Sequence, residues 1–183
     1  KNLARRKTAI PRGVNLGKNA ATPLERAADD YLAGLRAVYT RADYIAINIS
    51  SPNTAGLRDL QGEKNLEQLL HALKREQTAL AERHGRYVPI ALKVAPDLGD
   101  EQIAVIARLV LSHRLDAVIA TNTSVARPGL DHEPLAREAG GLSGRPLRDL
   151  STAAIRGLYR QLQGRVPIIG AGGVSDAADA WEK

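Results

Sequence analysis

Amides and hydroxyls gather directly after an apolar run near residue 48. The run 44–47 (Tyr-Ile-Ala-Ile) is followed by the polar residues Asn48, Ser50, Ser51, Asn53 and Thr54. An asparagine carries two N–H donors and a carbonyl acceptor in one plane, which suits a flat, uncharged heterocycle with ring N–H and C=O groups. A serine flanked by two such amides can accept a proton when water or a cofactor-linked network assists it. The segment is therefore interpreted as a substrate cradle, with Ser51 as its proton-handling group.

The rest of the sequence argues against other roles for Ser51. The four histidines, at positions 71, 84, 113 and 132, fall in expected helices or in a long loop, so no Ser-His-Asp set is evident. They also lack the spacing of metal ligands, and the chain has no cysteine. We expect neither an acyl-transfer nucleophile nor a metal site.

Composition indicates one globular domain. The chain has 183 residues, of which 44% are apolar and 25% charged. The net charge of +6 is spread along the chain apart from a basic start, and five Tyr, one Trp and no Phe leave few stacking platforms, so nucleic-acid binding is not expected. No apolar run approaches membrane-spanning length, and no targeting signal opens the chain. Because the first residue is Lys1 rather than Met, we expect an internal piece of a longer protein.

Short apolar runs alternate with helical patterns, which predicts βαβ units and a parallel sheet. The expected strands are 13–16, 44–49, 89–94, 117–121 and 167–170. The expected helices are 23–39, 65–83, 101–112, 151–162 and one that follows Ser175-Asp176. Five such units fit either a doubly wound sheet or part of an eight-stranded α/β barrel. The polar excursion 126–148, which follows a strand end, favours the barrel.

Polar residues or glycines follow every expected strand, at the end where parallel α/β folds build their sites. They are Asn15; Asn48 with Ser51 and Asn53; Lys93; Thr121, Asn122 and Thr123; and the glycines from Gly170 to Gly173. Lys93 is either an exposed lysine at a strand end or, because its neighbours are apolar, a buried ammonium that requires a partner, which a bound anionic ring would supply. The glycines at 170–173 enter an expected helix, where free amides can hold a phosphate, and the second glycine-rich loop at 140–144 could approach the same phosphate.

These motifs together resemble the dihydroorotate dehydrogenases, specifically their quinone-dependent class 2. The matching stretches are GVNLGKN at 13–19, INISSPNT at 47–54 with GLR at 56–58, ALKVAPD at 91–97, IATNT at 119–123, GGLSGRPL at 140–147 and IIGAGGV at 168–174. Their order and spacing agree over essentially the whole chain. In this family the base is a serine in class 2 and a cysteine in class 1, so Ser51 resembles class 2.

The resemblance implies an α/β fold, a (β/α)8 TIM barrel that binds FMN and oxidises (S)-dihydroorotate to orotate in pyrimidine biosynthesis, passing electrons to a quinone. By matched position, the FMN contacts would be Asn15, Asn48, Lys93, Thr121, Gly144 and Gly173. The substrate contacts would be Asn48, Asn53, Asn122 and Thr123. Ser51 would be the catalytic base.

The resemblance also sets the expected extent of the domain. Residues 1–183 would form a single, incomplete FMN-binding barrel with about five βα units, the third to the seventh strands. The parts expected outside it include the membrane-associating helices, which would place the protein peripherally on the cytoplasmic side of the cell membrane. A monomer is expected. The alternatives are a class 1-like or dihydropyrimidine-dehydrogenase-like FMN barrel, and a barrel piece that is inactive alone.

Overall fold

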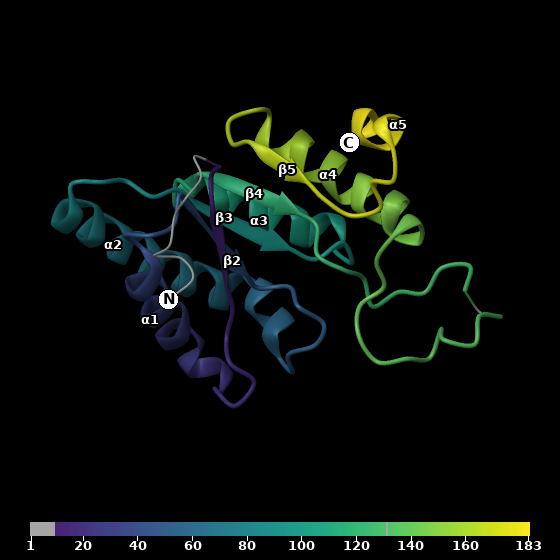
Figure 1. The fold of residues 1–183 in the computed structure, drawn as a ribbon, viewed down its shortest axis with the longest axis horizontal. Coiled ribbons are helices and arrows are strands. Elements are labelled where there is room, and N and C mark those ends of the chain that lie inside the picture. The colour runs from purple at the N-terminus through teal and green to yellow at the C-terminus, as the bar shows by residue number, and fades with distance from the viewer. Residues whose placement is uncertain (1–9, 131) are drawn as a thin grey trace.

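The computed structural model describes residues 10–130 and 132–183, which form a parallel sheet with helices between the strands (Figure 1). The strands are β1 (Gly13–Leu16), β2 (Tyr44–Asn48), β3 (Ile90–Val94), β4 (Ala117–Ala120) and β5 (Ile168–Gly170). The α-helices are α1 (Ala27–Val38), α2 (Glu63–His84), α3 (Asp100–Ser112), α4 (Arg148–Leu162) and α5 (Ala177–Glu182). Single 3-10 turns occur at η2 (Leu24–Arg26), η3 (Leu57–Gln61) and η4 (Arg145–Leu147). The basic cluster of residues 1–7 lies outside the described residues.

The strand order separates the two architectures that the sequence left open. The sheet runs β1-β2-β3-β4-β5 with every neighbouring pair parallel, so its order never reverses. A doubly wound sheet needs such a reversal at its switch point. Helices α1 to α4 each pack against the next, as they do around the outside of a barrel. The described part is therefore consistent with five consecutive βα units of a TIM barrel, as predicted.

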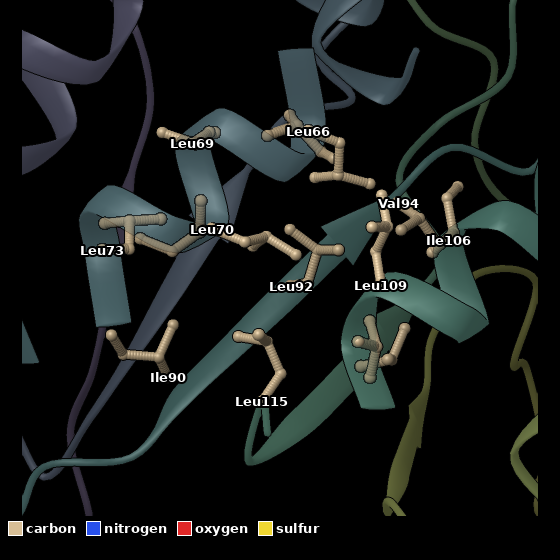
Figure 2. Close-up of a cluster of buried hydrophobic side chains, with 14 of the residues drawn as sticks. Leu66, Leu69, Leu70, Leu73, Ile90, Leu92, Val94, Ile106, Leu109 and Leu115 are labelled. Atoms are coloured by element: carbon tan, nitrogen blue, oxygen red, sulfur yellow. The ribbon is translucent and has the colours of Figure 1, made fainter. Parts of the chain in front are cut away.

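One face of the sheet forms the core with the helices. Leucines of α2, at positions 66, 70 and 73, face Ile90 and Leu92 of β3, and Leu69 belongs to the same buried cluster (Figure 2). Leu92 is completely buried, since it sits between α2 and the residues around α3. The opposite face is open: the side chains of Tyr44 and Ile169 on it are 37% and 46% exposed. Alternate residues of each strand therefore point either into the core or toward the open face.

Element ends differ from the sequence prediction by a few residues, each with a local cause. Helix α1 begins at Ala27 rather than at residue 23, because Pro23 is extended and η2 precedes the helix. Helix α4 begins at Arg148 rather than Ser151, because η4 with its proline leads directly into it. The last helix follows Ser175-Asp176 as expected, and the carboxylate of Asp176 caps it by accepting a hydrogen bond from the amide of Asp179.

No helix in the part of the chain that the structure describes combines the length and the apolar character needed to cross a bilayer.

Candidate functional site

The amides predicted to form the cradle meet at the carboxyl end of the sheet. Asn48 Oδ1 accepts hydrogen bonds from the amide of Ser50 at 3.2 Å and from Asn122 Nδ2 at 3.1 Å. Asn122 Nδ2 also lies 3.1 Å from Ser50 Oγ, which donates to the carbonyl of Lys93 at 2.9 Å. Ser50 is fully buried. One network therefore ties the ends of β2, β3 and the segment after β4 together, although sequence reasoning assigned no role to Ser50.

A buried tyrosine on α1, Tyr31, contacts this network through the backbone of Asn48. The hydroxyl of Tyr31 on α1 donates to the carbonyl of Asn48 at 2.7 Å, and the side chain is completely buried. Burial raises the pKa of Tyr31 well above its usual value, so the hydroxyl keeps its proton and remains a donor. The apolar periodicity of α1 identifies Tyr31 as a core residue, but nothing in that pattern reveals the polar contact at its tip.

Lys93 lies beside Asn48 on the open face of the sheet. The two residues are paired in the register of β2 and β3, so their side chains leave the sheet in the same direction. Lys93 is half-buried, and its ammonium donates no hydrogen bond and forms no ion pair within residues 10–130 and 132–183. Asn15 pairs with Ala46 two positions below Asn48 and is exposed on this same face. The face thus presents an unpartnered cation beside amides.

Ser51 lies at the edge of the cradle. It is half-buried, and its Oγ accepts a hydrogen bond from the amide of Asn53 at 3.3 Å. Asn53 itself is exposed, and a Cβ added to Gly140 would lie 3.5 Å from Asn53 Oδ1. Gly141 packs directly on the side chain of Thr123, because a Cβ there would clash with Thr123 Oγ1 and lie 2.9 Å from a carbon of Pro52. The glycine loop therefore borders the cradle.

Backbone pairing closes the long loop between β4 and α4, to which these glycines belong. Ser124 and Leu142 exchange two antiparallel hydrogen bonds, of 3.0 and 2.8 Å, and so close the loop between β4 and α4. The guanidinium of Arg127 donates to the carbonyls of Ser124 and Gly140, which lie at the two ends of the excursion. The extended loop is visible in green beyond the end of β4 (Figure 1). Its glycines are thereby fixed beside the strand ends.

The two predicted phosphate loops meet at the start of α4. Gly144 is the N-cap of η4, and Gly173, with φ of 71°, packs so closely on Arg148 that a Cβ would lie 2.5 Å from the amide nitrogen. The amides of Gly172, Gly173 and Val174 donate no hydrogen bond to any described residue. Thr121 is buried, and its amide bonds to the carbonyl of Ala171, which joins this loop to the tip of β4. Free amides next to a helix start are the arrangement that binds an anionic group.

A side-chain network that the sequence did not reveal holds the strand ends together. Arg58 in η3 donates to Asp97, which follows β3, and to the carbonyls of Ser50 and Thr123. Asp97 also accepts the hydroxyl of Ser124. Arg58 and Asp97 both fall in the motifs quoted above, but their pairing across 39 positions carries no local signal.

Direct contacts or strand pairing connect four of the sequence-predicted site residues, which are Asn48, Lys93, Asn122 and Thr123. Ser51 and Asn53 follow Asn48 closely in the chain and bond to each other, but within the described residues no hydrogen bond joins either side chain to those four. Asn15 shares their face one strand away, and Gly144, Gly173 and Thr121 belong to the neighbouring glycine-lined corner. The roles assigned to these residues by resemblance stay predictions.

A sequential parallel sheet whose amide, hydroxyl and lysine side chains meet beyond the strand ends defines a barrel-type α/β enzyme domain. The sequence profile of the family described as "Dihydroorotate dehydrogenase" matches residues 1–183. The chain belongs to the dihydroorotate dehydrogenase family.

Relatives and solved structures agree with this assignment. A protein of Nitrosomonas europaea named dihydroorotate dehydrogenase (quinone) is 60% identical over 171 residues, which are 93% of this chain and 50% of the relative. A protein of the same name from Methylobacillus flagellatus is 57% identical over 183 residues, which are 100% of this chain and 54% of the relative. The chain thus spans about half the length of these relatives. The dihydroorotate dehydrogenase of Eimeria tenella, solved with ferulenol, has a TM-score of 0.89 at 38% identity, over 97% of this chain and 50% of that chain.

Proposed function

We propose that this chain supplies the substrate cradle and part of the flavin site of an enzyme that oxidises (S)-dihydroorotate to orotate in pyrimidine biosynthesis. The electron acceptor proposed is a quinone. The observation that carries the proposal is the joining of Asn48, Asn122 and Lys93 at one edge of the sheet, next to Ser51, in a chain of this family. The proposal extends to residues 1–183 as one incomplete barrel domain, to a monomer, and to peripheral membrane association through other parts of the protein.

The donor set fits FMN. A flavin offers ring carbonyls and nitrogens, which gain negative charge on reduction, and a terminal phosphate. Lys93 is a cation without a protein partner among the described residues, and Asn15 and Asn48 share its face. The unused amides at 172–174 and the neighbouring Gly144 suit the phosphate. Thr121 would line the ring site between these two regions. FMN, when bound, supplies the hydride acceptor.

Ser51 would remove the proton. Oxidation takes a proton from C5 and a hydride from C6 of the substrate, which leaves a C5–C6 double bond. The Oγ of Ser51 is half-buried and accepts only the amide of Asn53 among described donors, so it retains a lone pair for the C5 proton, while its own hydroxyl proton would pass to water. Asn48, Asn53, Asn122 and Thr123 would hold the planar substrate so that both C–H bonds are correctly directed.

The test uses a chimeric holoenzyme, in which residues 1–183 replace the matching segment of the Methylobacillus flagellatus relative and FMN is bound. Ser51→Ala should lower dihydroorotate oxidation by about 10²- to 10⁴-fold while the yellow flavin absorbance persists. Ser112→Ala is the matched control and should retain full turnover, because among the described residues the Ser112 hydroxyl bonds only to the carbonyl of Leu109 in the same helix. Unchanged turnover in Ser51→Ala would remove this residue from the mechanism.

Two further measurements test the finer parts of the proposal. The chimeric holoenzyme should reduce a quinone and not fumarate or NAD, and preference for either of those acceptors would favour a class 1-like or dihydropyrimidine-dehydrogenase-like enzyme. The 183-residue chain alone should not retain FMN, because the part of it that the structure describes brings five strands to the site, whereas a closed barrel has eight. Stoichiometric FMN in that chain would contradict the incomplete domain.

A further inference from the structure

One guanidinium contacts the ends of three strands. Arg58 Nε donates to the carbonyl of Ser50 at 3.2 Å, Nη1 donates to Asp97 Oδ2 at 2.8 Å, and Nη2 donates to the carbonyl of Thr123 at 2.9 Å. These acceptors follow β2, β3 and β4 respectively. A planar guanidinium directs its donors at fixed angles, whereas a lysine ammonium is a single point of charge. Arg58 therefore sets the relative position of three loops with one rigid group.

The two carbonyls that Arg58 holds are next to site residues. The carbonyl of Ser50 belongs to the peptide that enters Ser51, the proposed base. The carbonyl of Thr123 belongs to a residue of the proposed substrate cradle, whose amide is bonded to Asn122 Oδ1 at 2.9 Å. A rotation of either peptide plane would move Ser51 Oγ or the cradle, although Arg58 itself need not touch the substrate.

Both partners of the ion pair are anchored. Arg58 belongs to η3, in which Leu57 and Leu60 are buried, so its backbone is fixed in the core. Asp97 also accepts the hydroxyl of Ser124 and the amide of Val125. The side chains of Arg58 and Asp97 are only 22% and 19% exposed, so water and salt screen their attraction little.

We propose that Arg58, held by Asp97, is a positioning residue that aligns Ser51 with the substrate bound by Asn122 and Thr123. This inference rests on the proposed function. It predicts that loss of Arg58 slows proton removal from the substrate more than it weakens the fold, and that it leaves electron transfer to the quinone unchanged.

The chain offers a matched control at the other end of the sheet. Arg86 Nη2 donates to the carbonyl of Ala42 at 2.8 Å and to Asp43 Oδ1 at 3.1 Å. It thus combines a carboxylate and a backbone carbonyl as Arg58 does, but before β2 and away from the carboxyl end of the strands. In α/β barrels that opposite end serves stability rather than catalysis.

The experiment compares Arg58→Gln, Arg58→Lys and Arg86→Gln in the chimeric holoenzyme. Stopped-flow absorbance separately gives the rate at which dihydroorotate bleaches the flavin and the rate at which quinone restores its colour. Orotate titration gives the product affinity, thermal unfolding gives the midpoint temperature, and hydrogen exchange reports opening of residues 50–53. We expect bleaching to be about 100-fold slower in Arg58→Gln, the size associated with a misplacement of about 1 Å.

The three variants should differ in which of the measured quantities they change. Arg58→Lys should restore the midpoint temperature but not the bleaching rate, because one ammonium cannot serve both carbonyls and Asp97. Exchange at residues 50–53 should increase in both Arg58 variants, and quinone should reoxidise them at the unaltered rate. Arg86→Gln should lower only the midpoint temperature.

Other outcomes would overturn the inference in distinguishable ways. Bleaching at the parent rate in Arg58→Gln or Arg58→Lys would show that the alignment does not depend on this guanidinium. If Arg86→Gln slowed bleaching as much, the effect would be general destabilisation. If Arg58→Gln did not fold, the Arg58→Lys rate would decide alone. A parent chimera that binds FMN but is not bleached by dihydroorotate would instead contradict the proposed function.

Discussion

Replacement of Lys93 by methionine should weaken flavin binding without destabilising the apoprotein. Lys93 is half-buried beside Asn48, and its ammonium has no acceptor in the described part of the chain. A protein gains nothing from desolvating such a cation unless a ligand pairs with it. Loss of one charge-assisted hydrogen bond, worth about 1.5–3 kcal/mol, corresponds to a FMN dissociation constant about 10- to 100-fold higher in Lys93→Met.

Lys18 provides the contrasting lysine. It is only 7% exposed, and its ammonium donates to the carbonyls of Asn19 and Thr22 at 2.9 and 2.6 Å. Lys18→Met should therefore lower the free energy of unfolding by about 1.5–3 kcal/mol, since the charged donor has structural partners. Its FMN affinity should be nearly unchanged.

The assay uses the chimeric protein stripped of FMN. Fluorescence titration with FMN gives the dissociation constant, and urea unfolding of the apoprotein gives the free energy of unfolding. Lys93→Met should leave the latter within about 0.5 kcal/mol of the parent or raise it. A loss above 1 kcal/mol together with unaltered FMN affinity would show that Lys93 is a structural residue like Lys18, and would refute the reasoning.

Three further predictions concern the surroundings of the site. Tyr31→Phe removes the hydroxyl that donates to Asn48, so urea unfolding should show a loss of about 1 kcal/mol; a larger loss in FMN affinity than in stability would indicate a direct role. Gly141→Ala places a methyl group against Thr123, so orotate affinity measured by titration should fall about 10-fold; full affinity would mean that the loop does not border the ligand. Burial lowers the pKa of His113 below 6.5, so the unfolded chain binds that proton more readily, and the free energy of unfolding should decrease as the pH falls through 6.5; His113→Gln should lessen this slope, and an unchanged slope would contradict the assignment.

The strands could be predicted from the sequence because each is a short apolar run bounded by polar residues. The confirmed starts at Gly13, Tyr44 and Ala117 show how strongly such runs specify a parallel strand. The beginning of α4 was displaced because Pro and Gly before it form a 3-10 turn continuous with the helix, and helix periodicity does not report such a turn.

The sequence predicted those parts of the candidate site that consist of polar residues at the ends of apolar strands. Asn48, Lys93 and Asn122 all follow apolar runs, and parallel strands end at one edge, so their proximity follows from the topology. The contacts of Arg58 with Ser50, Asp97 and Thr123 were not predictable, because they join residues 8, 39 and 65 positions apart through side-chain rotamers. Such long-range pairing depends on packing that only the folded chain specifies.

The hydrogen bonds of Asn48 and Asn122 also fix the orientation of their side-chain amides, that is, which atom is the oxygen and which is the nitrogen. The Ser50 N–H can only donate, so the Asn48 atom facing it must be oxygen, and the Asn48 NH2 group, which bonds to no described residue, is left available. By the same logic the Thr123 N–H fixes the oxygen of Asn122, whose NH2 is already engaged by Asn48 and Ser50. The free NH2 group of Asn48 consequently selects a ligand atom with a lone pair. A keto oxygen can accept its hydrogen bond, whereas a ring N–H would place two hydrogens against each other.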